Sequence, residues 1–376
     1  PFHRAVYYVS AAHVHFDLGD VEKARMFLDE SLRFARDIRS SVHEYQSLLI
    51  KAYFDLSEGR VDEGREALRS ALKLGAGGGL SHITIWWNSR MLTTLFTEAL
   101  ESGMEEDYVR ACIRALGFVP DEPPVTCEGW PWPLKVYTLG RFRIEKDGRP
   151  VGTSRKAQRK SDELVKALVA FGGESVRDDT LCDALWPGAD GDKAHSALTT
   201  TVARVRSMLG SDRCLVVSGG RLSLDPRLCW VDARAFEETL RRAEEKKGKG
   251  PGERAVTLLE RALRLYGGDF VAEDADFPWA QSMRDRLRQK CASAAGTLSK
   301  AMERRGDHAA AARLCEKGLE ADDLNEEMCR RLMTCCVRLG RRGDGVEAYK
   351  RCRQALSRKL GIKPSPETEK VYKRLS

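Results

Sequence analysis

The chain has 376 residues, of which 42% are hydrophobic and 32% charged, a normal composition for a globular protein. At about 100–200 residues per domain, this length predicts two to four domains. No apolar run approaches the roughly 18 residues of a membrane span, which excludes a transmembrane segment. The first residues, Pro1-Phe2-His3-Arg4, contain neither an initiator Met nor a signal-peptide pattern, so we expect a piece of a longer protein.

The net charge of +7 is unevenly distributed along the chain. Residues 1–133 contain 14 Lys/Arg and 20 Asp/Glu, residues 134–230 contain 17 and 12, and residues 231–376 contain 32 and 24. This asymmetry predicts that the last two-thirds of the chain meets a polyanion and that the first third does not.

The 11 cysteines include no CxxC pair and no Cys/His cluster with zinc-ligand spacing, so we expect no metal site. An odd number of cysteines in a long chain with a normal core predicts reduced, mostly buried thiols in a cytoplasmic protein. Adjacent Cys335 and Cys336 allow a redox switch as the alternative, but nothing nearby supports it.

Residues 1–117 are predicted to form helical hairpins. Similar segments follow Gly19, Gly59 and Gly103, at spacings of 40 and 44 residues. These spacings exceed the roughly 34 residues of a tetratricopeptide repeat, although the helix-turn-helix organisation is the same. Small residues such as Ala24 and Gly64 allow paired helices to approach closely.

Two segments in this part of the chain are expected to interrupt its helices. Residues 75–79 are rich in glycine and predict a flexible break. Residues 118–133 contain five prolines, so this segment is expected to be an extended linker and a domain boundary. Trp130 and Trp132 are expected to pack the linker onto a domain.

From residue 134 the apolar residues alternate as they do in strands, so residues 134–230 are predicted to form a small α+β unit. Strands are expected at 134–139 and 142–145, with a hairpin turn at Asp147-Gly148. The later elements are helices at 155–171, 178–185 and 192–209, then a hairpin at 215–224 around Gly219-Gly220. Short strands, three helices and a hairpin make a winged helix, in which a helix fits the major groove of DNA.

Residues 231–376 are again predicted to be helical. Segments beginning at Gly306 and Gly340 are equivalent and lie 34 residues apart, the tetratricopeptide period. Residues 246–252 are expected to form a flexible loop between the first two helices. The predicted fold class is therefore mainly α, with tetratricopeptide-like helical repeats flanking a small α+β winged-helix DNA-binding domain.

The helix at 192–209 has an apolar face and a polar face at the helical period. The residues expected in the core are Ala194, Leu198, Thr201, Val202, Val205, Met208 and Leu209. The opposite face has small side chains at its centre, expected to meet base edges, and basic side chains at its flanks, expected to meet phosphates. The central residues are Ser196, Thr199, Thr200, Ala203 and Ser207, and the flanking residues are Lys193 and Arg204 on one side and His195 and Arg206 on the other. An ordinary solvated face is the alternative for any isolated helix.

Other basic residues extend the predicted DNA-binding set. Arg221 directly follows Gly219-Gly220 and is expected to contact the DNA backbone or minor groove. Arg206 has the alternative of folding back onto the domain in an ion pair. A cluster without acidic residues precedes the first helix, for which a phosphate clamp and a solvated face remain equally open: Arg149, Arg155, Lys156, Arg159 and Lys160.

Several motifs in order resemble the antibiotic-regulatory-protein family of bacterial activators. In the winged helix they are Leu139-Gly140-Arg141-Phe142, Arg155-Lys156, Leu185-Trp186-Pro187, and Ala194 with Leu198 and Ala203-Arg204-Val205-Arg206-Ser207-Met208-Leu209-Gly210. Later motifs resemble the bacterial transcriptional activator domain of that family: Trp230-Val231-Asp232-Ala233, Leu265-Tyr266-Gly267-Gly268-Asp269-Phe270 and Leu360-Gly361-Ile362-Lys363-Pro364-Ser365-Pro366. The resemblance covers about residues 134–376; Val205 stands where the family usually has Leu.

The resemblance implies a regulator that binds direct repeats in promoter DNA and recruits RNA polymerase, with the 192–209 helix in the major groove and the 215–224 hairpin as the wing. It leaves homo-oligomer formation open. Residues 1–117 look like the helical repeats that link a nucleotide-binding switch domain to the effector in large regulators of this kind.

An enzyme is not expected, because the GxxxxGK[ST], GxSxG and HExxH motifs are absent. We therefore predict no catalytic residue, cofactor, metal or membrane partner. The remaining alternative is a helical-repeat scaffold whose winged helix binds protein rather than DNA.

Overall fold

The computed structural model describes residues 2–80, 88–151, 159–245, 252–274 and 276–375. It divides into two compact units, residues 1–132 and residues 133–376. The described chain is mainly helical with small sheets, as the sequence predicts. Within these ranges, every helix is too short or too polar to cross a membrane.

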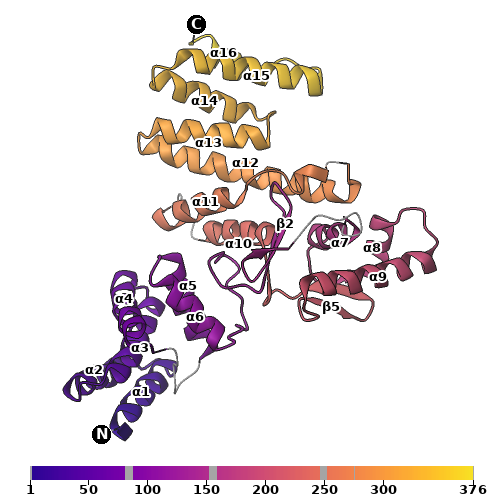
Figure 1. Ribbon diagram of the computed structural model, residues 1–376. Helices are drawn as coiled ribbons and strands as arrows, with labels where there is room; N and C mark the ends of the chain where they lie inside the picture. Colours follow the sequence, from indigo (N-terminus) through magenta and orange to yellow (C-terminus); the bar gives the residue numbers. More distant parts are fainter. Residues whose placement is uncertain (1, 81–87, 152–158, 246–251, 275, 376) are drawn as a thin grey trace. The chain divides into compact units, whose positions relative to one another are not determined.

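The first unit consists of helical hairpins (Figure 1). Its described helices are α1 (Phe2–Asp17), α2 (Val21–Asp37), α3 (Ser41–Ser57), α4 (Val61–Gly78), α5 (Ser89–Glu101) and α6 (Glu106–Ala115). Gly19, Gly59 and Gly103 lie in the turns between paired helices with φ of 79°, 80° and 67°, a region that glycine enters without a steric cost. A Cβ on Gly64 would lie 2.8 Å from Leu56 Cγ, so α3 and α4 approach closely, as predicted.

The predicted break at residues 75–79 is wrong, because α4 continues to Gly78 and Gly79 ends it in the left-handed conformation. Gly75 is buried, and a Cβ there would lie 2.2 Å from the Tyr108 hydroxyl oxygen. That hydroxyl donates to the Leu80 carbonyl at 2.6 Å, and its oxygen lies 3.1 Å from the Tyr45 hydroxyl oxygen. Tertiary packing therefore holds a helix that local glycine content disfavours.

The segment from residue 118 to residue 132 is not helical, as predicted, but it folds into turns instead of running extended. The amides of Cys127 and Trp130 donate to the carbonyls of Pro124 and Cys127. Trp132 Nε1 donates to the Cys127 carbonyl at 2.9 Å, and both Trp130 and Trp132 are buried. The tryptophans thus turn the proline-rich chain back on itself.

The second unit opens with a four-stranded sheet in the order β3-β2-β1-β7. Its strands are β1 (Leu134–Tyr137), β2 (Arg143–Lys146), β3 (Arg149–Pro150) and β7 (Cys229–Val231). β1 pairs antiparallel with β2 and parallel with β7, with Val136 opposite Val231. The two ends of the segment predicted as a winged helix therefore meet in one sheet.

Between these ends lie three helices and a second, three-stranded sheet in the order β4-β6-β5. The elements are α7 (Arg159–Ala170), β4 (Val176–Arg177), α8 (Asp178–Leu185), α9 (Gly191–Leu209), β5 (Leu215–Ser218) and β6 (Arg221–Leu224). Apolar residues of all three helices, including Leu168, Leu181 and Leu198, are buried in one core. This is the predicted winged-helix fold. Residues 152–158, where the predicted first helix began, lie outside the described residues.

The rest of the second unit stacks helical hairpins one after another (Figure 1). Its elements are α10 (Asp232–Glu245), α11 (Glu253–Leu265), the 3-10 turns η1 (Ala272–Asp274) and η2 (Pro278–Ala280), α12 (Gln281–Arg304), α13 (His308–Ala321), α14 (Glu326–Arg338), α15 (Arg342–Leu360) and α16 (Pro366–Tyr372). Gly306 and Gly340 occupy equivalent turns before α13 and α15, which confirms the predicted period. The predicted loop at 246–252 lies outside the described residues except for Gly252.

Buried Asp232 joins the winged helix to these helical hairpins. Its carboxylate, at the start of α10, accepts hydrogen bonds from the amides of Thr138 and Leu139, at 2.7 and 2.8 Å, and from the Ala233 amide at 2.7 Å. The Thr138 hydroxyl also donates to it at 2.7 Å. Burial raises the pKa of Asp232 to about 6, and these donors oppose that effect.

A second link pairs two of the motifs on which the family resemblance is based. The Gly140 amide donates to the Asp269 carbonyl at 2.9 Å, and the Val271 amide donates to the Thr138 carbonyl at 2.7 Å. Gly140 has a φ of 95°, and a Cβ there would lie 3.3 Å from the Gly267 backbone. The glycines of both motifs are needed because two backbones pass in close contact.

All 11 cysteines are buried and none is in a disulfide, as the sequence predicts. Burial raises the pKa of Cys335 to about 12 and also raises that of Cys336. Both thiols therefore stay protonated at neutral pH, which disfavours a redox switch at this pair. In the described ranges, no three His, Cys, Asp or Glu residues gather as a metal site would require.

Candidate nucleic-acid interface

Helix α9 separates into the two faces that the sequence predicts. Ala194, Leu198, Thr201, Val202, Val205 and Leu209 are buried, and Met208 is half-buried. The residues predicted at the polar face are exposed: Lys193, His195, Ser196, Thr199, Thr200, Ala203, Arg204 and Ser207. Because the helix is held through its apolar face, its polar face is presented rigidly to solvent.

One flank of α9 borders a shallow hollow of about 400 Å³. Lys193, Thr200 and Arg204 line it from α9, at spacings that place them on one stripe of the helix. Lys193 and Arg204 are exposed and form no ion pair within the described ranges. Two uncompensated cations around small hydroxyl side chains suit a phosphate backbone that passes along this flank.

The opposite wall of the hollow comes from Lys160 at the start of α7 and from Trp186 after α8. Lys160 Nζ donates to the Leu185 carbonyl at 2.9 Å, lies 5.6 Å from the Trp186 ring centre and pairs with Glu163 at 2.7 Å. Sequence analysis placed Lys160 only in a basic cluster and Trp186 only in a family motif. Neither has a local signal for this position, because the contact depends on how three helices pack.

The central threonines of α9 have fixed hydroxyl groups. Thr199 Oγ1 donates to the His195 carbonyl at 2.9 Å, and Thr200 Oγ1 donates to the Ser196 carbonyl at 3.0 Å. Each hydroxyl proton is thus used within the helix, and the oxygen lone pairs remain as acceptors toward solvent. Thr200 faces the hollow and is the better placed of the two to meet a base edge beside Lys193 and Arg204.

The other flank of α9 is less suited to a polyanion. His195 Nε2 lies 3.2 Å from the Asp179 carboxylate of α8. A hydrogen bond from Arg177 lowers the pKa of Asp179, so a negative charge stays beside His195. The Arg206 guanidinium folds back, as the alternative predicted, but it donates to the Leu215 carbonyl at 3.0 Å and not to a carboxylate. Lys193 and Arg204 therefore dominate the positive charge of this helix.

The wing and the start of α7 contain the remaining predicted residues. Gly219 and Gly220, with φ of 56° and 69°, form the turn between β5 and β6. Arg221 is exposed, and its guanidinium donates to the Ser175 carbonyl at 2.8 Å. Arg159 is exposed but pairs with Glu163 at 3.0 Å. Arg155 and Lys156 lie outside the described residues.

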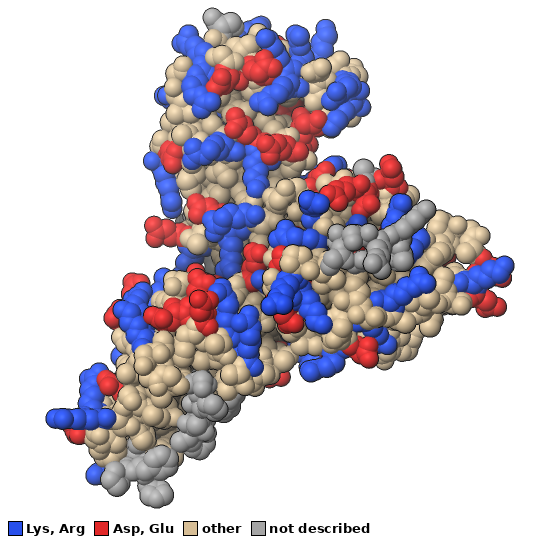
Figure 2. All heavy atoms as spheres, viewed as in Figure 1, with Lys and Arg blue, Asp and Glu red and all other residues tan. Residues whose placement is uncertain are grey.

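The helical hairpins after the winged helix have a mixed surface. Figure 2 shows Lys and Arg interspersed with Asp and Glu over α12 to α16. Arg331 pairs with Glu303 at 2.7 Å, and Lys359 pairs with Asp323 at 2.7 Å. Local ion pairs thus neutralise some of the cations of residues 231–376, and acidic residues are interspersed with the others on this face, whereas Lys193 and Arg204 line one hollow beside α9.

Residues 231–376 match the family model of the bacterial transcriptional activator domain. Over 212 residues, the chain is 30% identical to the transcriptional regulator RedD of Streptomyces coelicolor, a match covering 54% of this chain and 59% of that protein. The chain thus contains a match to the bacterial transcriptional activator domain and is similar to bacterial transcriptional regulators. It is also 28% identical to the regulatory protein AfsR of Streptomyces coelicolor, over 64% of this chain and 24% of that protein.

A solved structure has a similar fold. Mycobacterium tuberculosis EmbR in complex with a low-affinity phosphopeptide matches with a TM-score of 0.52 and 23% identity, covering 65% of each chain. The chain spans less than two thirds of the length of these relatives: 59% of RedD and 24% of AfsR.

Proposed function

We propose that the second unit binds duplex DNA in a sequence-specific manner through α9, and that the protein activates transcription by recruiting RNA polymerase to the bound promoter. The observation that supports this most is the flank of α9, where Lys193, Arg204 and Thr200 surround a hollow on a rigid winged helix. An α-helix fits the major groove, and cations at its flank reach the phosphates.

The roles within α9 follow from position and partners. Thr200, with Thr199 and Ser196 beside it, meets base edges, while Lys193 and Arg204 contact phosphates. Arg206 positions the Leu215 backbone at the base of the wing. Arg221 approaches the DNA backbone or minor groove at the wing.

The test begins with selection of bound sites from a random duplex library, followed by electrophoretic shifts on the selected site and on random duplex. Arg204→Ala should weaken binding to both, because a phosphate contact is independent of sequence. Arg338→Ala removes an exposed arginine at the end of α14 and is the matched control; it should leave both affinities unchanged. If Arg204→Ala affects the selected site alone, Arg204 contacts a base instead of a phosphate.

Recruitment is tested separately by adding purified RNA polymerase to the chain on its selected site. A larger, slower complex that forms on this site and not on random duplex supports recruitment. If the polymerase binds equally with and without the chain, the chain regulates in another way.

A second candidate is a scaffold whose winged helix binds protein. Strand β5 is at the edge of its sheet, and Val216 and Val217 are 40% and 46% exposed there. An exposed apolar edge strand accepts a strand from a partner. A folded chain that shows no duplex binding even at low salt would favour this candidate.

A further inference from the structure

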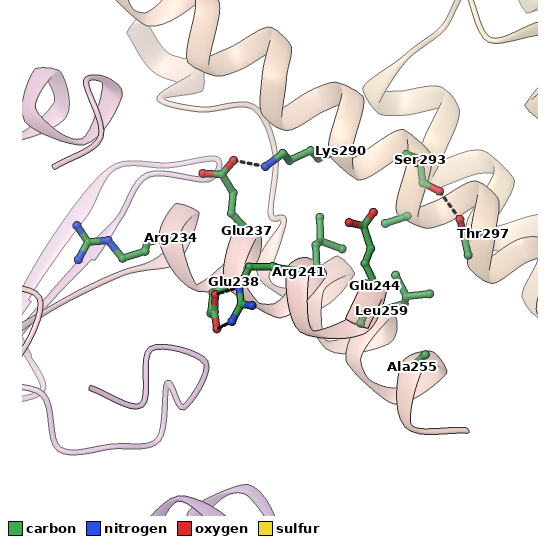
Figure 3. Close-up of a pocket in the computed structure, with 13 residues that line it drawn as sticks. Arg234, Glu237, Glu238, Arg241, Glu244, Ala255, Leu259, Lys290, Ser293 and Thr297 are labelled. Carbon is green, nitrogen blue, oxygen red and sulfur yellow. Dashed lines mark hydrogen bonds and ion pairs between the residues drawn. The ribbon is translucent and has the colours of Figure 1, made fainter. Parts of the chain in front are cut away.

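A cavity of about 460 Å³ lies among α10, α11 and α12, away from α9 (Figure 3). Its size falls within the roughly 300–1,000 Å³ that small organic ligands occupy. Its floor is apolar and consists of Leu240, Ala243, Ala255, Leu259 and Ala294. An apolar ligand body placed there would remove these surfaces from water.

The cations at the rim of the cavity are already neutralised. Lys290 pairs with Glu237 at 2.6 Å, as the dashed line in Figure 3 shows. Arg241 pairs with Glu238 at 2.7 Å. Arg234, at the end nearest the winged helix, pairs with Glu174 at 2.9 Å. An anionic ligand would have to break one of these pairs before it gained a partner.

Glu244 is the exception at this rim. Its side chain extends from α10 toward α12 (Figure 3), and it forms no ion pair or hydrogen bond with any residue in the described ranges. A carboxylate that is unpaired among the described residues and lies above an apolar floor favours a ligand with the opposite charge.

We propose that this cavity binds a small molecule with an apolar body and a single amine, the body on the Leu240–Leu259 floor and the ammonium group against Glu244. This inference goes beyond DNA binding and does not depend on it, since none of the lining residues belongs to α9 or the wing.

The test uses three probes with one apolar body: phenylbutylamine, phenylbutanol and phenylbutyrate. Ligand-observed NMR with the full chain measures their affinities. The amine should saturate a single site and bind about fivefold more tightly than the alcohol, the gain of one partly exposed ion pair, and the carboxylate should bind most weakly. No saturable binding of the amine, or equal binding of amine and carboxylate, would overturn the proposal.

Variants locate the binding. Glu244→Gln should reduce amine affinity about fivefold, to the level of the alcohol, and leave the alcohol unchanged. Glu260→Gln, on α11 outside the cavity, is the control and should change neither. Ser293→Trp places an indole from an exposed position of α12 into the cavity and should abolish binding of all three probes. With the fold of each variant verified by its melting curve, retention of binding in Ser293→Trp or unchanged amine affinity in Glu244→Gln would contradict this site.

Discussion

The exposed face of α9 and the buried junction around Asp232 use charge in opposite ways. At the junction, one carboxylate accepts hydrogen bonds from three amides and a hydroxyl, all within 2.8 Å. On α9, Lys193 and Arg204 are exposed and form no ion pair with the residues that the structure describes. The first arrangement is satisfied within the chain, whereas the two cations of the second are available for the phosphate contacts that we propose.

The difference separates stability from function. A saturated buried group costs much to remove, because its donors are left without partners. An uncompensated surface cation costs little to remove, because water already solvates it. Substitutions at the junction should therefore lower the free energy of unfolding. Substitutions on α9 should weaken DNA binding while the protein stays folded.

Asp232→Ala should have the largest effect on stability. The amides of Thr138, Leu139 and Ala233 lose their buried acceptor, and we expect a loss of about 3 kcal/mol or more in the free energy of unfolding. Urea denaturation of the full chain measures it. Asp307→Ala, which removes an exposed cap of α13, is the comparison and should cost only about 1 kcal/mol. Equal losses in the two variants would mean that buried Asp232 contributes no more to stability than an exposed helix cap.

Thr200→Ala should act on specificity. The Thr200 oxygen is an acceptor at the centre of the proposed interface, so its loss should cost roughly 1–3 kcal/mol on the selected site and little on random duplex. Thr257→Ala on α11 is the control, because its exposed hydroxyl also donates to a carbonyl of its own helix and lies outside α9. Competition binding measures the affinity for the selected duplex and for random duplex. An equal loss of affinity on both would mean that Thr200 contacts a phosphate and not a base.

Arg221→Ala should have the smallest effect. The Ser175 carbonyl already accepts a hydrogen bond from this side chain, which limits its reach toward DNA. We expect a modest and equal weakening on all duplexes, below about 1 kcal/mol. Fluorescence anisotropy at low salt measures it; unchanged affinity there would show that the wing does not engage DNA through Arg221.

Much of the winged helix was predictable because its signals are local. Helix α8 has the predicted bounds, and α9 begins one residue earlier than predicted. The spacing of apolar residues in α9 predicted its buried face, and Gly219-Gly220 predicted the turn of the wing. These features depend on the order of neighbouring residues alone.

The features that could not be predicted depend on distant contacts. Gly75 stays helical because the side chains of Tyr45 and Tyr108 pack against it from α3 and α6. Asp232 accepts hydrogen bonds from Thr138, which lies 94 residues earlier in the chain. Lys160 and Trp186 join the flank of α9 only through the packing of α7, α8 and α9. The DNA-binding roles of the α9 residues themselves remain predictions.

The salt dependence of duplex binding tests the central claim most directly. The affinity of the wild-type chain and of a Lys193→Ala/Arg204→Ala double variant is measured on random duplex over a series of salt concentrations. If both cations contact phosphates, the slope of log affinity against log salt should decrease in magnitude by about two in the double variant. A double variant that stays folded and keeps the wild-type slope would contradict the assignment of this flank of α9 to DNA.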